Sequence, residues 1–169
     1  MNVADIAHAL SLQCRFTGHT RTFYSVAQHS LIAAQIAKGF GWSKKTQFVC
    51  LMHDATEAYL CDIASPLKRQ PEFAAYRKVE AGLWAAMCQR WNLPAVLPNY
   101  VKEIDGRLCT TEALELMPTM PLAWHRVVPP AYTRAELDHC GVTTEHFRPA
   151  PPEIVRSNFR NAFKELWNS

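Results

Sequence analysis

The chain has 169 residues, of which 49% are hydrophobic and 20% are charged. This composition is typical of one globular domain and excludes an intrinsically disordered chain. The formal net charge of +3 is mild, so the sequence favours an anionic small molecule at one local site over a nucleic-acid track, which would need a dense basic stripe.

No stretch approaches the about 20 apolar residues that span a bilayer, and the start MNVADIAHAL has neither a basic region nor a cleavage site. The six cysteines contain no CxxC pair, which is typical of reduced thiols and disfavours a cysteine-type zinc site. We therefore expect a cytoplasmic protein with no membrane and no nucleic-acid partner.

The first half of the chain predicts three helices. A short helix is expected over residues 3–12. A second is expected within YSVAQHSLIAAQIAKGFG, where apolar residues recur at helical spacing before two glycines. Its apolar stripe comprises Val26, Ala33, Ile36 and Phe40. A third is predicted over about 44–60 with Ser43 as its N-cap. Its stripe comprises Phe48, Met52, Ala55 and Tyr59.

The second half continues the helical pattern with two interruptions. The segment DIASPLKRQ is predicted as a loop, and long helices follow over about 71–91, opened by Pro71, and about 99–116. Residues 117–150 are proline-rich and are expected to be irregular. The segment PPEIVRSNFRNAFKELW (151–167) predicts an amphipathic helix. Its inward residues are predicted to be Ile154, Phe159, Phe163 and Leu166. The predicted fold is one all-α domain spanning 1–169.

The stretch LMHDATEAY, residues 51–59, carries the first candidate chemistry. On a helix, Glu57 lies at i+4 from His53 and at i+3 from Asp54, so the three side chains project in nearly one direction, away from the apolar stripe. A solvated polar face is the alternative interpretation of a lone His-Asp pair.

Two further residues favour a metal site. His29 and Asp105 lie on the apolar sides of their predicted helices, where an unpaired carboxylate costs several kcal/mol or shifts its pKa. An isolated core histidine is usually structural. Together with His53 and Asp54, however, they form the nitrogen and oxygen ligand set of a divalent cation, whose charge would also resolve the burial of the carboxylates.

The order His29, His53-Asp54, Asp105 resembles the H…HD…D signature of HD-domain metal-dependent phosphohydrolases. The resemblance extends to small bacterial 5′-deoxynucleotidases and to phage dATP triphosphohydrolases. It rests on CRFTGHTRTFYSVAQHS, HDATEAYLCDIASPLK and KEIDGRLCTTEAL, which span about residues 5–116 and leave the proline-rich segment 117–150 and the helix 151–167 outside. It implies a compact HD-domain helical bundle.

The resemblance also implies roles for residues beside the ligands. One divalent ion (Zn, Co, Mn or Mg) would be held by His29, His53, Asp54 and Asp105, and would activate water and polarise a phosphoryl group. Glu57 would be the general base. Asp62 would orient water or a sugar hydroxyl, with an ordinary helix-end residue as the alternative.

Substrate contacts are expected from residues that flank these motifs. Basic groups near a metal can hold phosphate oxygens, and an aromatic ring can stack on a nucleobase. The predicted contacts are Arg15, Phe16, His19, Arg21 and Lys68, with solvated surface charges as the alternative for the basic ones. Phe23 and Tyr24 are expected in the core. Histidines outside the motifs are interpreted as surface or structural: His125, His139 and His146.

Four functions are weighed on this basis. The first is hydrolysis of deoxynucleoside triphosphates, with dATP cut to deoxyadenosine and tripolyphosphate, which in a phage would favour diaminopurine over adenine in DNA. The second is a 5′-deoxynucleotidase. A (p)ppGpp hydrolase is disfavoured because Ala55-Thr56-Glu57, and not an acidic pair, follows the HD dipeptide. A non-catalytic nucleotide-binding module is disfavoured by the intact ligand set. The resemblance further implies a homo-oligomer such as a hexamer, in the host cytoplasm if the gene is a phage gene.

Overall fold

The computed structural model describes residues 1–119 and 128–167, and every regular element in that part of the chain is helical. The elements are α1 Val3–Leu12, η1 Arg15–Gly18, α2 Val26–Gly39, α3 Lys44–Met52, α4 Glu57–Leu60, α5 Ser65–Lys68, η2 Pro71–Phe73, α6 Ala74–Trp91, α7 Asn99–Leu116, α8 Arg134–His139, η4 Thr144–Phe147 and α9 Pro152–Trp167. Among these residues the only bridge of β type is the isolated antiparallel pair Cys14–Ser25. The prediction of an all-α fold is confirmed.

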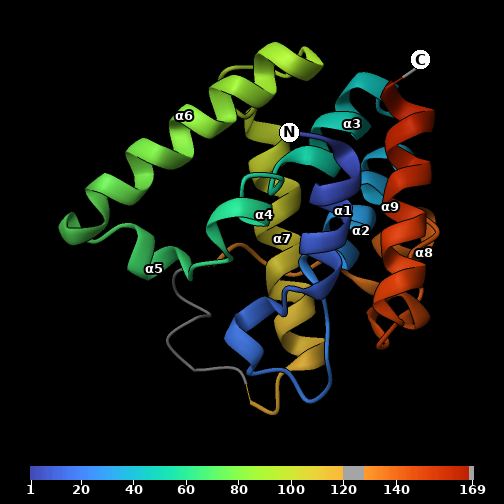
Figure 1. Cartoon of the computed structure of the whole chain (residues 1–169). Coiled ribbons are helices and arrows are strands. Elements are labelled where there is room, and N and C mark those ends of the chain that lie inside the picture. Colours follow the sequence, from blue (N-terminus) through green and yellow to red (C-terminus); the bar gives the residue numbers. More distant parts are fainter. Residues whose placement is uncertain (120–127, 168–169) are drawn as a thin grey trace.

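The bundle is built around α2. This helix packs on α3, α1, α7 and α9, and α9 also covers α1 and α3 (Figure 1). Each of these helices contributes large apolar side chains that are fully buried: Ile6 and Leu10 in α1, Ile36 in α2, Leu51 and Met52 in α3, Leu108 in α7 and Phe159 in α9. Their burial supplies the hydrophobic stabilisation that holds the helices in one core.

Side-chain caps fix where the first helices begin. The side chain of Asn2 accepts a hydrogen bond from the amide of Asp5 at the start of α1. Ser25 forms a capping box with Gln28 at the start of α2, and Ser43 accepts from the amide of Thr46 at the start of α3. Each cap satisfies an amide that has no partner inside its helix. The predicted N-cap at Ser43 is confirmed.

The predicted helix over 44–60 is not continuous. It ends at Met52, residues 53–56 form turns, and α4 begins at Glu57. The amides of Ala55 and Glu57 bond to carbonyls three residues back, at Met52 and Asp54, so the backbone winds more tightly than an α-helix. This change rotates the later side chains, and Tyr59, predicted to be in the core, is 44% exposed.

Two other core predictions are wrong. Phe40 lies just after the end of α2 and is 37% exposed. Ile154 is 53% exposed, and its neighbour Val155 is buried in its place with Phe159, Phe163 and Leu166. The buried residues of α9 follow the i, i+4, i+8 and i+11 spacing of one helix face from 155, and 154 falls outside that face.

Short helices occur in both segments that were predicted to be irregular. The expected loop after Asp62 contains α5, which has Pro66 in its first turn. The segment 117–150 contains α8, started by a capping box between Thr133 and Glu136, and then η4. Figure 1 shows α6 extending to one side of the bundle; within it only Met87 and Trp91 are buried.

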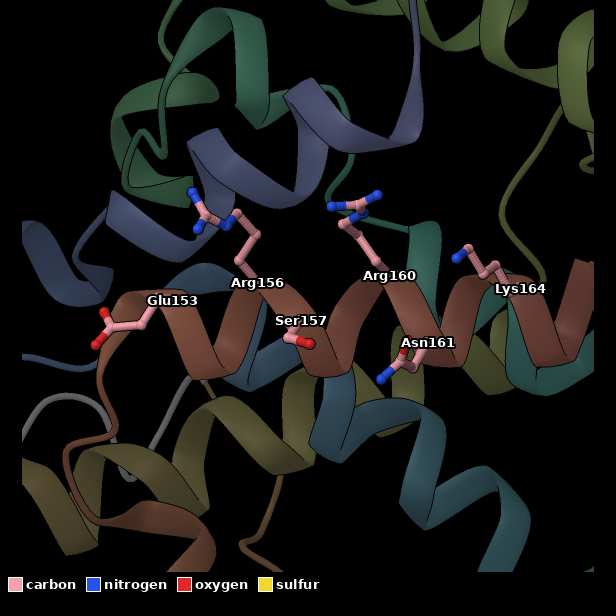
Figure 2. A pocket seen from close by; sticks show the side chains of 6 residues that line it. All are labelled: Glu153, Arg156, Ser157, Arg160, Asn161 and Lys164. Carbon is pink, nitrogen blue, oxygen red and sulfur yellow. The ribbon is translucent and has the colours of Figure 1, made fainter.

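The outer face of α9 carries a hollow lined by polar residues (Figure 2): Glu153, Arg156, Ser157, Arg160, Asn161 and Lys164. They lie along one stripe of the helix, on the side opposite its buried residues, and none belongs to the predicted site. Across the described residues, no helix combines the length and the apolarity needed to cross a membrane.

Candidate metal centre

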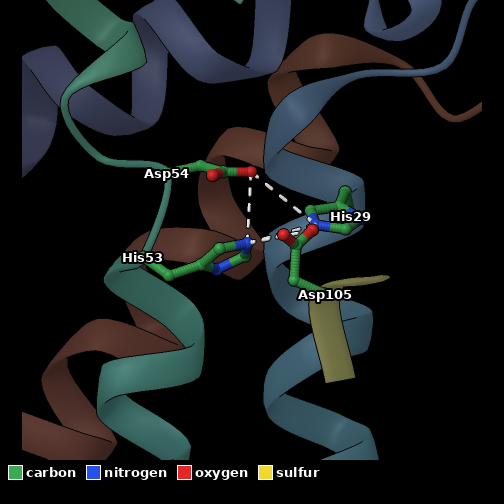
Figure 3. A group of neighbouring side chains, drawn as sticks. All are labelled: His29, His53, Asp54 and Asp105. Carbon is green, nitrogen blue, oxygen red and sulfur yellow. Dashed lines mark hydrogen bonds and ion pairs between the residues drawn. The ribbon is translucent and has the colours of Figure 1, made fainter. Parts of the chain in front are cut away.

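The four predicted ligands meet in space (Figure 3). His29 comes from the second turn of α2, His53 and Asp54 from the turn that follows α3, and Asp105 from α7. One nitrogen or oxygen atom from each lies within 4.8 Å of the others. His29 Nε2 is 3.2 Å from both His53 Nε2 and Asp105 Oδ1, and His53 Nε2 is 3.2 Å from Asp54 Oδ2. This group could hold a metal ion.

Hydrogen bonds behind the two imidazoles select the nitrogens that face the centre. His29 Nδ1 lies 2.8 Å from Glu112 Oε1, and His53 Nδ1 lies 2.7 Å from the carbonyl oxygen of Cys50. Because a carboxylate and a carbonyl only accept, both Nδ1 atoms carry the hydrogen. In neutral rings both Nε2 lone pairs then converge at 3.2 Å, where neither can donate to the other. A cation between them resolves this contact, so the donor set fits a divalent ion.

The charges around the centre also favour a bound cation. Burial opposes the charged form of His53, but Asp54 and Asp105 outweigh it and raise the pKa of His53 well above its usual value. Burial likewise opposes the charged form of Asp54, yet His53 lowers the pKa of this carboxyl to about 2. The pKa of Asp105 is held well below its usual range, against burial, by its contacts with His29 and His53, at 3.2 and 3.7 Å. The cluster therefore attracts positive charge, which a proton or a metal ion can supply.

Glu57 is buried beside this cluster and is not one of its four members. Its Oε1 accepts a hydrogen bond from Lys68 Nζ over 3.2 Å, whereas Oε2 is buried and has no hydrogen-bond partner among the described residues. Burial, followed by the charges of Asp54 and Asp62, raises the pKa of Glu57 to about 9. A perturbed carboxyl with one oxygen unbonded is suited to exchange a proton with a ligand at this site.

The segment that follows Glu57 is fixed by Gln13 at the end of α1. Gln13 Nε2 donates to the carbonyl of Glu57 over 2.8 Å, and its Oε1 accepts from the amide of Asp62 over 3.2 Å. Between them, Cys61 adopts φ 67° and ψ 157°, a conformation that is costly for any residue except glycine. Burial raises the pKa of Asp62. The charge of Asp54 acts in the same direction, whereas the charges of Arg15 and Lys68 oppose it. The backbone of Asp62 is thus fixed by Gln13, beside the segment that carries Glu57.

Only part of the predicted phosphate-binding set gathers at the ligands. Arg15 is buried, with Nη1 3.6 Å from Asp54 Oδ2, and Lys68 joins Glu57. Arg21 donates to the carbonyls of Glu115 and Pro118 at the C-terminal end of α7. Glu115 lies ten residues beyond Asp105, which is about 15 Å along the helix axis.

The remaining predicted contacts are more exposed. His19 is exposed at the end of η1. Phe16 is half-buried with φ 53°, and its ring lies 5.4 Å from the guanidinium carbon of Arg15. Of the histidines interpreted as surface or structural, His139 and His146 are exposed, and His125 lies outside the described residues.

Glu112 is a residue that the sequence analysis missed. It is fully buried on α7, and its carboxylate contacts His29, Arg15 and Tyr24. One signal was available, because Glu112 lies at i+7 from Asp105 and therefore on the same face, two helical turns away. Tyr24 is fully buried, as predicted, whereas Phe23 is only half-buried.

No protein-family profile matches the chain. It is similar to the uncharacterized protein YfdR of Escherichia coli strain K12, with 40% identity over 114 residues, covering 68% of this chain and 60% of that protein. It is also similar to the uncharacterized protein RCAP_rcc00048 of Rhodobacter capsulatus, with 35% identity over 106 residues, covering 60% of this chain and 54% of the other. The matches thus span little more than half of each relative, and neither name states an activity.

Proposed function

We propose that this protein is a metal-dependent phosphohydrolase that acts on deoxynucleoside phosphates. The observation that carries the proposal is the meeting of His29, His53, Asp54 and Asp105 beside a buried glutamate, Glu57, whose Oε2 has no partner among the described residues. A purely structural cluster gains nothing from a buried carboxyl oxygen left without a bond, which costs about 1–3 kcal/mol. A proton acceptor at a reaction site requires such an oxygen.

The roles of the residues follow from their positions. A divalent ion held by the four ligands would supply charge to activate water and to polarise the phosphoryl oxygen. A bound divalent ion would favour the ionised form of Glu57. In that form Glu57 takes a proton from the attacking water while the water oxygen bonds to phosphorus and the phosphorus–oxygen ester bond breaks. Lys68 and Arg15 offer cationic donors to the phosphate oxygens. A proton then passes to the leaving sugar oxygen, which departs as the hydroxyl group of the nucleoside.

The first candidate substrate is dATP, cut to deoxyadenosine and tripolyphosphate. The sequence resemblance to phage dATP triphosphohydrolases supports it. In this reading Phe16 stacks on the base and Asp62 orients water or a sugar hydroxyl. The protein would act in the cytoplasm of the cell as a homo-oligomer such as a hexamer, which light scattering coupled to gel filtration would measure.

The second candidate is a 5′-deoxynucleotidase, and the placement of the cations favours it. A triphosphate tail needs several cationic donors, whereas one phosphate is satisfied by the metal and one or two cations. Among the described residues that were predicted to bind phosphate, Arg15 and Lys68 lie with the ligands, but Arg21 is bonded to backbone carbonyls at the end of α7. Arg69 is exposed and bonded to the carbonyl of Ser65.

A product assay separates these candidates. The full chain, loaded in turn with Zn²⁺, Co²⁺, Mn²⁺ and Mg²⁺, is incubated with all deoxynucleoside mono- and triphosphates and their ribose counterparts. Ion chromatography of tripolyphosphate from dATP supports the first candidate, and orthophosphate from the monophosphates supports the second. Nucleotide binding without any product, at full metal occupancy, would refute hydrolysis and leave a non-catalytic binding module.

A further inference from the structure

Glu112 has a carboxylate that is completely enclosed and fully bonded. The residue is 0% exposed. Its Oε1 accepts from Tyr24 Oη over 2.9 Å and from His29 Nδ1 over 2.8 Å, and its Oε2 accepts from Arg15 Nε over 3.0 Å. These donors lie 83 to 97 residues earlier in the chain, so the contacts depend on the folded bundle.

Stability alone is a weak reason to retain this group. Removing a carboxylate from water costs several kcal/mol, and well-packed apolar residues often replace a buried ionic network without loss of stability. Three donors meet the two oxygens of Glu112, Tyr24 Oη and His29 Nδ1 on Oε1 and Arg15 Nε on Oε2, so the group is an acceptor on both oxygens. An apolar side chain could not orient the donors that bond to these two oxygens.

The first partner is a ligand of the candidate metal centre. Glu112 Oε1 requires a hydrogen on His29 Nδ1, and this leaves the lone pair on Nε2, which lies 3.2 Å from Asp105 Oδ1 in the centre. The same bond fixes the rotation of the ring. Partners of this kind behind a ligating histidine typically change metal affinity by about 10- to 100-fold.

The second partner is the cation at the edge of the centre. Because Glu112 Oε2 bonds to the Nε of Arg15, the guanidinium is anchored at its base and its Nη atoms extend towards Asp54, with Nη1 3.6 Å from Oδ2. Its planar group is thereby oriented beside the ligands.

We propose that Glu112 is a positioning residue that uses one carboxylate to set the tautomer of the metal ligand His29 and the place of the anion-binding Arg15. The part that concerns Arg15 rests on the proposed function, whereas the part that concerns His29 requires only that the centre binds a metal. Loss of Glu112 therefore weakens metal binding even when no nucleotide is present.

Glu112→Gln is the informative substitution because an amide cannot serve all three donors. If the amide oxygen faces His29 and Tyr24, the NH₂ group faces the Nε–H of Arg15, and two donors oppose each other. If the amide is flipped, its NH₂ group faces the Nδ1–H of His29 and the hydroxyl of Tyr24 instead. Tyr24→Phe is the matched control, since it removes one buried hydrogen bond to the same carboxylate and leaves the bonds to His29 and Arg15 intact.

The test uses the full chain and Zn²⁺ or Co²⁺ alone. Metal affinity is measured by competition with a chelator, and folding by circular dichroism. We expect Glu112→Gln to lose about 10- to 100-fold in affinity and Tyr24→Phe to lose less than about threefold. Wild-type affinity in a folded Glu112→Gln protein, or equal losses in both variants, would overturn the proposal. At saturating metal, binding of inorganic phosphate to Glu112→Gln is expected to weaken about tenfold; unchanged phosphate binding would overturn the part that concerns Arg15.

A measurement on the wild-type protein does not depend on whether a variant folds. ¹⁵N–¹H correlation spectra of the histidine rings in the Zn²⁺-loaded protein should show His29 with hydrogen on Nδ1 and zinc on Nε2. The opposite assignment would overturn the proposal. Absence of turnover with every nucleotide would refute the proposed function and leave these two readouts intact, so the two failures can be told apart.

Discussion

Lys68 donates from its ammonium to Oε1 of Glu57, eleven residues earlier in the chain, over 3.2 Å. The same ammonium donates to Glu80 of α6 over 3.0 Å, so it connects Glu57, which is buried beside the candidate centre, to the helix at the side of the bundle. Burial and the neighbouring carboxylates raise the pKa of Glu57 to about 9, and the charge of Lys68 acts in the opposite direction. Lys68 thus helps to set the pH at which Glu57 can accept a proton.

Replacing Lys68 with methionine should move the acidic limb of the kcat–pH profile to higher pH. Without the ammonium the ionised form of Glu57 loses a favourable charge, so its pKa rises and less carboxylate is present at a given pH. Lys78→Met, at an exposed lysine of α6, is the control and should leave the limb in place. An unmoved limb in the Lys68 variant, measured at saturating substrate and metal, would show that the limb does not report Glu57.

Glu57→Gln should retain the metal and lose most of the turnover. Glu57 is not among the four clustered ligands, so metal content measured by plasma mass spectrometry should stay equal to that of wild type. A general base typically contributes about 10²–10⁴-fold, and kcat should fall by that factor. Turnover near the wild-type value would mean that another group accepts the proton from water.

The ligands themselves are tested by removing them singly. Purified protein should carry close to one divalent ion per chain, and His53→Ala or Asp105→Ala should lose both the ion and the activity, since each removes one of four donors. His146→Ala, at an exposed histidine whose ring accepts from the amide of Thr143 three residues earlier, is the control. Full occupancy in a folded Asp105→Ala protein would remove Asp105 from the ligand set.

The four clustered residues could be predicted from the sequence because each carries a local signal. His29 and Asp105 interrupt apolar stripes, and His53-Asp54 is a pair of chemical groups that a core does not tolerate without a partner. Glu112 carries only a weaker signal, its position two helical turns beyond Asp105 on the same face of the helix. A glutamate between a threonine and an alanine in a helix is ordinarily predicted to be exposed. The burial of Glu112 depends on Tyr24 and Arg15, far away in the chain.

The errors in the predicted helices have a similar origin. The helix prediction uses a period of 3.6 residues per turn, so the predicted helix continues through residues 53–56. In the structure, hydrogen bonds to carbonyls three residues back wind this segment more tightly. The helices α5 and α8 are too short to show a period. The start of α8 did carry a readable sign, because Thr133 and Glu136 have the T-x-x-E spacing of a capping box.

Two glycines in helices should respond to alanine in opposite directions. Gly39 is the last residue of α2 and lies against Cys140, which follows α8. A Cβ at Gly39 would stand 2.6 Å from Cβ and 2.8 Å from Sγ of Cys140, so the two segments would have to move apart. Gly82 lies in the interior of α6, and a Cβ there meets nothing within 4 Å.

We expect Gly39→Ala to lower the free energy of unfolding by about 1–3 kcal/mol, as overpacking of a tight contact does. Gly82→Ala should raise it by about 0.5–1 kcal/mol, because alanine loses less backbone entropy in a helix than glycine. Urea unfolding with a chelator present, followed by circular dichroism, measures both without a contribution from metal binding. If both variants were stabilised, the approach of α2 to Cys140 would be looser than the structure shows. If Gly82→Ala were destabilised, its side of α6 would be covered by a surface that the single chain does not contain.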